Sequence, residues 1–229
     1  MTENEILKRI YPSVVTFIGN WRKMTKEVFN LGLTDISLFL TCAGYMERQE
    51  IYRELEKTKV KNIPHVHIRH DMRESELDYL SSRFCAKSFT VHYQYFFKFF
   101  KKSRYSKKMF IENNNGQSRI KELRLVKESG GICIDLSHLK HFENFYPDYF
   151  LLTKKAADNY RIGCNHLSAI LANGKSWHKV KKFSDLDYLK TIPKKYFSEY
   201  ICLEMANPVK EQLKFKKYIA KILAESWKG

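Results

Sequence analysis

Short apolar runs recur along the whole chain, and most of them end in a polar residue. Each run is rich in β-branched or aromatic residues, which is typical of a buried strand. Eight runs fit this description: VVTFIG from Val14, ISLFLT from Ile36, IPHVHI from Ile63, SFTVHY from Ser88, KMFIEN from Lys108, GICID from Gly131, RIGCNH from Arg161 and EYICLE from Glu199.

Helical patterns lie between these runs, as in RQEIYRELEKTK from Arg48 and SELDYLSSRF from Ser75. Strands separated by helices imply parallel crossovers. Eight such units predict an α/β fold, a closed (β/α)8 TIM barrel in which Tyr200 to Leu203 lie beside Val14 to Ile18. No linker divides residues 1–229, which predicts a single compact domain. An open doubly wound sheet is the alternative, but no glycine-rich phosphate loop follows the first strand.

Imidazole or carboxylate groups stand at the C-terminal ends of six consecutive predicted strands. These residues are His65 and His67 on the third strand, His92 on the fourth, Glu112 on the fifth, Asp135 and His138 on the sixth, His166 on the seventh and Glu204 on the eighth. In such barrels the C-terminal strand ends form the active face. Histidine and carboxylates are the ligands that zinc and manganese prefer. The pattern therefore predicts a divalent metal, zinc first, with manganese or magnesium as alternatives. Taken singly, each residue also fits a core histidine or a helix cap, as Asp135 would in DLSH.

The charge of the chain adds a possible partner. Its 229 residues contain 41 Lys and Arg against 25 Asp and Glu, a formal net charge of +16. This balance favours an anionic partner, either a polyanion or a phosphorylated small molecule, although a solvated lysine-rich surface is the alternative. The segment Tyr93 to Lys108, YQYFFKFFKKSRYSKK, mixes aromatic and basic residues. It can stack bases and follow phosphates, or its phenylalanines can pack a barrel helix.

The cysteines and the chain ends bear on location. The five cysteines are odd in number and form no CxxC pair, which favours a reduced cytoplasmic protein over a disulfide scaffold or a zinc finger. No apolar run approaches the roughly 18 residues that cross a bilayer, so no membrane association is expected. MTENEILKRI does not resemble a signal peptide. The oligomeric state stays open.

Several short motifs together resemble one family. FIENNNGQS, GICIDLSH, IGCNHLSA and ICLEMANP are similar to motifs of the xylose-isomerase-like TIM barrels, and most closely to those of the apurinic/apyrimidinic endonuclease branch. NIPHVHI and TVHYQ stand where that branch places single histidines. The resemblance covers about residues 36–220 in strand order.

The resemblance implies a set of metal ligands. Glu112 would bridge two metals, with His92 and a third-strand histidine completing the first site. Asp135, His166 and Glu204 would complete the second site. His67 is favoured over His65 on the third strand, because it shares the same strand face nearer the exit, whereas His65 follows the family's Pro-His pattern.

A third metal site is also implied, with His138 and His178 as ligands. The family expects an Asp two residues before the last histidine, and this chain has Ser176 there. Asp185 or Asp187 is the substitute that the sequence offers.

Two enzymatic functions follow, with Glu112 and Glu204 as catalytic residues in both. The first is metal-dependent hydrolysis of phosphodiesters in nucleic acid, on abasic or single-stranded DNA, which predicts a barrel mouth rimmed by Lys and Arg. The alternative is isomerisation or epimerisation of a sugar or sugar phosphate, with both glutamates on one metal and a proton shuttled next to a polarised carbonyl. A third possibility is a catalytically degenerate barrel that only binds a metal or a ligand.

Overall fold

The computed structural model describes residues 1–113 and 126–228. Its centre is one sheet of nine parallel strands, in the order β1-β11-β8-β7-β6-β5-β4-β3-β2. The strands of this sheet are β1 (Ile10–Tyr11), β2 (Ser13–Val15), β3 (Ser37–Phe39), β4 (His65–His67), β5 (Ser88–Val91), β6 (Met109–Glu112), β7 (Gly131–Asp135), β8 (Ile162–Leu167) and β11 (Ile201–Leu203). Each of the eight predicted runs contributes to one of them.

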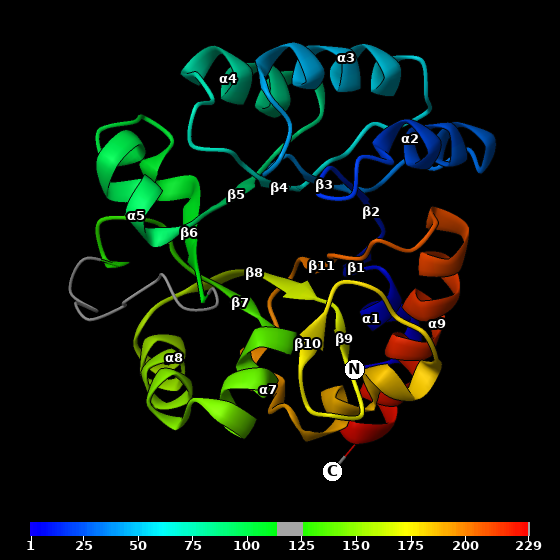
Figure 1. Cartoon of the computed structure of the whole chain (residues 1–229), viewed down its shortest axis with the longest axis vertical. Coiled ribbons are helices and arrows are strands. Elements are labelled where there is room, and N and C mark those ends of the chain that lie inside the picture. Colours follow the sequence, from blue (N-terminus) through cyan, green and yellow to red (C-terminus); the bar gives the residue numbers. More distant parts are fainter. Residues whose placement is uncertain (114–125, 229) are drawn as a thin grey trace.

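Helices surround this sheet (Figure 1). The α-helices are α1 (Glu3–Leu7), α2 (Trp21–Asn30), α3 (Tyr45–Glu56), α4 (Glu74–Arg83), α5 (Tyr93–Tyr95), α7 (Leu136–Phe145), α8 (Pro147–Asn159) and α9 (Val209–Ser226). A π-helix, η1 (Phe96–Phe100), continues α5. The described residues also form 3-10 segments, η2 (Ser106–Lys108), η3 (Phe183–Thr191) and η4 (Lys194–Tyr196). The α/β architecture is confirmed. None of the described helices has the length and apolar character needed to cross a membrane.

The sheet is nearly closed, and its two ends belong to one short chain segment. β1 pairs with β11, β2 pairs with β3, and only Pro12 separates β1 from β2. Proline has no N–H to donate to a ladder, so it interrupts the strand at this point. The sheet therefore has nine strands instead of the eight expected. The expectation that Val14 to Ile18 would lie beside the last strand is wrong, because Ile10 and Tyr11 hold that position.

Side chains bridge the break at Pro12. The Ser13 N–H donates to Gln212 Oε1 at 2.7 Å, and Gln212 Nε2 donates to the Ser13 carbonyl at 3.1 Å. The Ser13 hydroxyl donates to the carbonyl of Leu203 on β11. Gln212 on α9 is fully buried, so these bonds take the place of ladder bonds where β2 leaves β11.

Replacing Gln212 by Leu is expected to lower the free energy of unfolding by about 1–3 kcal/mol, because the buried Ser13 N–H loses its acceptor. Denaturant unfolding measures this change. Lys214→Leu, on an exposed position of the same helix, should change it by less than about 0.5 kcal/mol. Equal effects of the two substitutions would contradict the bridging role of Gln212.

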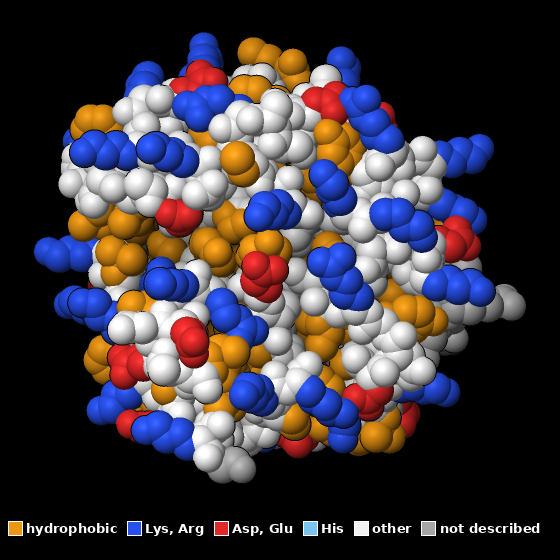
Figure 2. Space-filling model, turned by 180° about the vertical axis from the view of Figure 1, so that it is seen from behind, with side chains coloured by type: hydrophobic (Ala, Val, Ile, Leu, Met, Phe, Trp, Pro, Cys, Tyr) orange, Lys and Arg blue, Asp and Glu red, His pale blue; other side chains and the backbone are white. Residues whose placement is uncertain are grey.

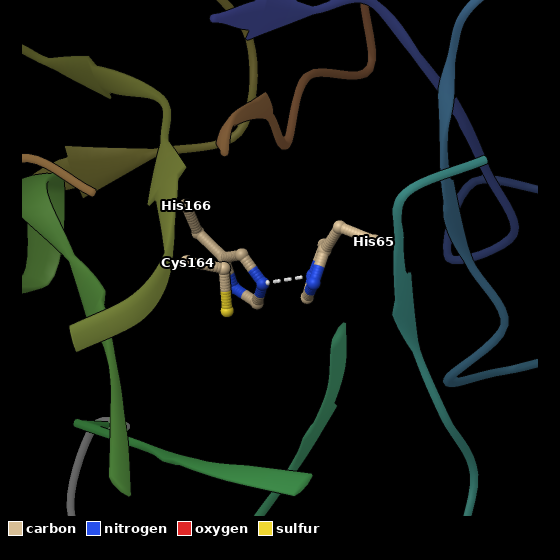
Figure 3. Close-up of side chains that lie close together, drawn as sticks. All are labelled: His65, Cys164 and His166. Atoms are coloured by element: carbon tan, nitrogen blue, oxygen red, sulfur yellow. Dashed lines mark hydrogen bonds between the residues drawn. The ribbon is translucent and has the colours of Figure 1, made fainter. Parts of the chain in front are cut away.

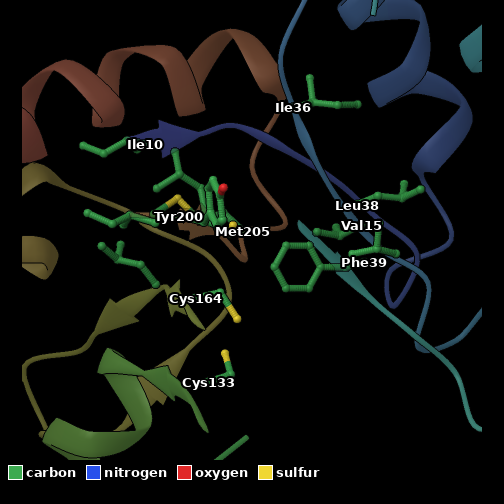
Figure 4. Packing of buried hydrophobic residues seen from close by; sticks show 14 of the residues in the cluster. Ile10, Val15, Ile36, Leu38, Phe39, Cys133, Cys164, Tyr200 and Met205 are labelled. Carbon is green, nitrogen blue, oxygen red and sulfur yellow. The ribbon is translucent and has the colours of Figure 1, made fainter. Parts of the chain in front are cut away.

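A large apolar core consists of buried side chains from the strands and from the helices packed against them. Figure 4 shows part of it, with Val15, Leu38 and Phe39 on one side and Cys133 and Cys164 on the other, their sulfur atoms turned toward one another. None of the five cysteines is in a disulfide. In the segment Tyr93 to Lys108, Phe96 and Phe100 are buried in this core and Phe97 packs on it, whereas Phe99 is 46 % exposed. Three of these four phenylalanines therefore pack against the barrel.

A small antiparallel hairpin was not predicted from the sequence. It consists of β9 (Ala169–Ile170) and β10 (Ser176–Trp177), and it follows directly on β8.

On the face shown in Figure 2, Lys and Arg side chains are scattered among apolar and acidic ones and form no single cluster.

Candidate metal centre

The polar strand tips meet at one end of the sheet. Neighbouring parallel strands carry their C-terminal ends to the same edge. His67 ends β4, Glu112 ends β6, Asp135 ends β7, His166 stands one residue before the end of β8, and His92 and Glu204 directly follow β5 and β11. The structure brings these side chains together into two adjoining groups that share Glu112.

Glu112 stands at the middle of the cluster, and its side chain is only 3 % exposed. Its Oε2 atom lies 3.0 Å from His67 Nε2 and 3.2 Å from His92 Nε2. Its Oε1 atom lies 2.9 Å from His166 Nδ1. The two oxygens of one carboxylate thus face two different sets of partners.

The first group consists of His67, His92 and Glu112. The second consists of Glu112, Asp135, His166 and Glu204. Within each group, one nitrogen or oxygen atom of every member lies within 4.8 Å of the others. Zinc bonds of about 2.0–2.2 Å draw ligands to within roughly 4 Å of each other, so small side-chain movements would complete either set.

The buried carboxylates and histidines of this cluster shift one another's pKa values. Burial alone would raise the pKa of the Glu112 carboxyl, but the charges of His67 and His166 and the hydrogen bonds that they donate keep that pKa well below its usual 4.5. Burial would lower the pKa of His166, but Glu112 and Glu204 raise it well above 6.5. The pKa of His67 falls, because desolvation outweighs the pull of Glu112.

Asp135 both caps a helix and faces the centre. Its Oδ1 atom accepts the His138 N–H at 2.8 Å and the Ser137 hydroxyl at 2.6 Å, which caps α7. Asn113 fixes its backbone, accepting the Asp135 N–H at 2.6 Å and donating to the Asp135 carbonyl at 3.1 Å. The motif FIENNNGQS therefore has a structural role at Asn113, and its residues 114–118 lie outside the described residues.

The second carboxylate oxygen of Asp135, Oδ2, shows whether these residues suit a metal ion. Asp135 is fully buried, and Oδ2 has no hydrogen-bond partner among the described residues. It lies 3.7 Å from His138 Nδ1, beyond hydrogen-bonding distance. A buried carboxylate oxygen without a partner is costly. A cation bound by this group would remove that cost, so the residues fit a divalent metal.

The two histidines of β4, the third strand predicted from the sequence, have different neighbours. His67 contacts Glu112 and lines the cavity above the cluster. His65 lies behind it, with Nε2 2.9 Å from His166 Nε2 and Nδ1 3.2 Å from the Ser88 hydroxyl. The geometry therefore places His67, and not His65, beside Glu112.

His138 and His178 both line the cavity but belong to neither group. Their ring centres are 6.1 Å apart, and His178 Nδ1 lies 3.3 Å from the Glu204 carbonyl oxygen. Ser176 lies on β10. Among the described residues, no set of three potential metal ligands contains His138 or His178.

The two aspartates offered in place of the missing Asp at position 176 are engaged elsewhere. Asp185 accepts the backbone N–H groups of Lys181 and Lys182 at 2.9 and 3.1 Å. Asp187 accepts the Tyr218 hydroxyl at 2.5 Å and pairs with Lys190 at 2.9 Å. Asp185 caps η3, and Asp187 is bonded to Lys190 and to Tyr218 on α9, so the structure shows neither aspartate beside His138 or His178.

A cavity of about 600 Å³ opens above the cluster. Its described lining is Phe17, Thr41, Cys42, His67, Ile68, Arg69, His70, His92, Tyr95, Glu112, His138, His178 and Glu204. Arg69 is the one Lys or Arg among these residues, so the described lining does not show the expected basic rim. The segment Tyr93 to Lys108 contributes Tyr95, whose ring stacks on His70 at 4.7 Å.

Arg69 was not singled out from the sequence, although it follows the third strand directly. Its Nε lies 3.5 Å from Asp71, and Asp71 accepts from the buried Arg48 at 3.0 Å. Arg48 also forms two bonds to Glu76, at 2.8 and 2.9 Å. Arg48, held in place by Glu76, thus binds Asp71, and Asp71 in turn lies beside the guanidinium of Arg69.

In comparisons with known proteins, no family model, no curated protein and no solved structure matches the chain.

Acid should weaken the metal-free protein through Glu204. Burial raises the pKa of its carboxyl, but His178 and His166 lower it more, to about 2 instead of 4.5. A depressed folded-state pKa adds stability above the unfolded value, which is lost as the pH falls from about 4.5 toward about 2. Urea unfolding across this range should show the loss. Glu204→Gln should reduce the slope and Glu199→Gln, at the opposite end of β11, should not; equal slopes would contradict the assignment.

Proposed function

We propose that the protein is a divalent-metal-dependent hydrolase of phosphodiesters, built on a TIM barrel in which β1 and β2 count as one strand. The observation that carries the proposal is the position of Glu112, whose two oxygens face His67 and His92 on one side and His166 on the other. A carboxylate shared in this way suits a pair of metal ions, and zinc suits the mixture of imidazole and carboxylate ligands.

The chain's own residues have distinct roles in this proposal. His67, His92 and Glu112 would hold one ion, and Asp135, His166 and Glu204 would hold the other together with Glu112. When bound, such a pair supplies a hydroxide at neutral pH and neutralises charge on the phosphate and the leaving oxygen. Arg69 would bind a non-bridging phosphate oxygen, and Tyr95 with His70 would offer a flat surface to a sugar or a base.

Nucleic acid, abasic or single-stranded DNA in particular, is the proposed substrate. The net charge of +16 supports it, because backbone binding relies on phosphate neutralisation. The cavity of about 600 Å³ would take one nucleotide unit, while the surface lysines would contact the flanking strand.

Metal analysis and a nicking assay test the proposal. About two zinc ions per chain are expected, with metal-dependent nicking of an abasic duplex that disappears in Glu204→Gln while salt-sensitive DNA binding persists. Glu199→Gln, an exposed residue that precedes β11 whereas Glu204 follows it, should retain nicking. Absence of nicking with zinc, manganese and magnesium, at full metal occupancy, would overturn the hydrolase.

An isomerase or epimerase of a sugar or sugar phosphate is the second candidate. The single Arg69 in the described lining favours it, because one cation suits one phosphate group better than a polyanion. Glu112 and Glu204 would then share one metal and move the proton next to a carbonyl. A single manganese or magnesium ion per chain and turnover of a sugar phosphate would support it. Metal binding without either activity would indicate a degenerate barrel.

A further inference from the structure

Three buried side chains lie beneath the candidate metal centre. They are His65 on β4 and Cys164 and His166 on β8, and none is exposed to solvent. Figure 3 shows the His65 and His166 rings pointing at each other across the barrel interior, with a hydrogen bond between their ring nitrogens. Neither His65 nor Cys164 lines the cavity, so this contact lies deeper than the site itself.

The hydrogen bond between the two rings links the position of the proton on one ring to its position on the other. His65 Nε2 lies 2.9 Å from His166 Nε2. At this distance one nitrogen must donate and the other must accept, because two N–H groups would repel and two lone pairs would not attract. The proton position on one ring therefore sets the proton position on the other.

His166 Nδ1 is the ring nitrogen that would bind a metal, and this determines where the proton of the ring must be. His166 Nδ1 faces Glu112 Oε1 at 2.9 Å and Glu204 Oε2 at 3.3 Å, so it is the nitrogen on the side of the candidate centre. To bind a metal, Nδ1 must carry a lone pair, and in the neutral ring the proton then sits on Nε2. His65 Nε2 must then accept a hydrogen bond from the His166 Nε2–H group.

The far side of His65 completes the chain of hydrogen bonds. If Nε2 accepts, the neutral His65 ring carries its proton on Nδ1, which lies 3.2 Å from the Ser88 hydroxyl oxygen and donates to it. The Phe39 ring packs against both imidazoles, with ring centres 5.9 Å from His65 and 4.8 Å from His166. This apolar neighbour excludes water that would otherwise compete for the same nitrogens.

We propose that His65 is a positioning residue, which accepts the Nε2 proton of His166 and so holds His166 Nδ1 ready to bind the metal. His65 itself is not a ligand. The inference rests on the metal centre of the proposed function, and it adds a residue and a hydrogen-bond direction that the ligand set alone does not contain.

A separate metal between His65, Cys164 and His166 would have to replace hydrogen bonds that these side chains already form. The two Nε2 atoms of the histidines are 2.9 Å apart, which is hydrogen-bonding distance. The Cys164 sulfur is already hydrogen bonded to the Thr90 hydroxyl at 3.2 Å. A hydrogen bond explains the contact without an ion.

Zinc titration of the metal-free protein tests the proposal. His65→Leu should lower the zinc affinity by about 10–100-fold, as loss of an outer partner of a metal-bound histidine does. His65→Gln, whose amide oxygen can accept the His166 proton, should restore most of this affinity. Cys164→Ser should leave the number of bound ions unchanged. Long-range ¹H–¹⁵N spectra of the zinc-loaded wild type should show His166 protonated at Nε2.

The outcomes separate the two proposals. Unchanged zinc affinity in His65→Leu, or loss of one bound ion in both His65 variants, would overturn the positioning role while the metal centre stands. A zinc-loaded wild type with His166 protonated at Nδ1 would overturn it too, even if His65→Leu failed to fold. A wild type that binds no zinc, manganese or magnesium would overturn the proposed metal centre itself.

Discussion

Replacing Glu112 by Gln is expected to abolish tight binding of both metal ions of the proposed centre. The amide keeps the shape of the side chain but removes the charge that His67, His92 and His166 all contact. Loss of an outer partner of a ligand already costs about 10–100-fold in metal affinity, so loss of the shared ligand should cost at least ~100-fold. Isothermal titration calorimetry of the metal-free variant with zinc measures this loss of affinity.

Glu143→Gln is the matched control, because this exposed glutamate on α7 pairs only with Lys140 among the described residues. It should bind zinc as the wild type does. If Glu112→Gln lost one ion and kept the other at full affinity, Glu112 would belong to a single site and the two groups would not share it.

Replacing Arg48 by Met is expected to lower the free energy of unfolding by about 3–5 kcal/mol. Arg48 is fully buried, and its guanidinium is paired with Glu76, which is only 4 % exposed. Methionine fills part of the space but leaves the Glu76 carboxylate buried without its cation, with the Tyr52 hydroxyl at 3.2 Å as a remaining partner. Urea unfolding measures the loss.

Arg22→Met separates this effect from the general loss of a cation. Arg22 pairs with Glu50 at 2.5 Å, but the two side chains are 62 % and 39 % exposed, and pairs at the surface contribute about 0–1 kcal/mol. The two variants should therefore differ by at least ~2 kcal/mol. Similar losses would show that Glu76 finds another partner or takes up a proton.

The strands could be predicted because each run carries its own pattern. GICID from Gly131 and SFTVHY from Ser88 contain β7 and β5 within two residues at each end. The beginning of the first strand was missed, because Pro12 divides it into pieces of two and three residues. Two-residue strands such as β9 and β10 leave no periodic pattern to read.

The residues of the candidate centre could be predicted for a similar reason. Strand order places each tip at the same edge, so one histidine or carboxylate per strand is enough to suggest convergence. Buried partners were not predictable in this way. Arg48 on an amphipathic helix has the pattern of a surface residue until Glu76 is placed beside it. The facing nitrogens of His65 and His166, 101 residues apart, depend on inward orientations that no local pattern shows.

The division of the first strand at Pro12 has a consequence for how the protein is made. β1 pairs with β11, whose residues follow Ile10 and Tyr11 by about 190 positions and are therefore synthesised much later. At about 5–20 residues per second, Ile10 and Tyr11 wait roughly 10 s or more for that partner. During this time the nascent sheet presents an unpaired edge, which can capture a strand from another chain. Proline blocks ladder formation at its own position, so Pro12 limits such mispairing to a two-residue edge until the native partner arrives.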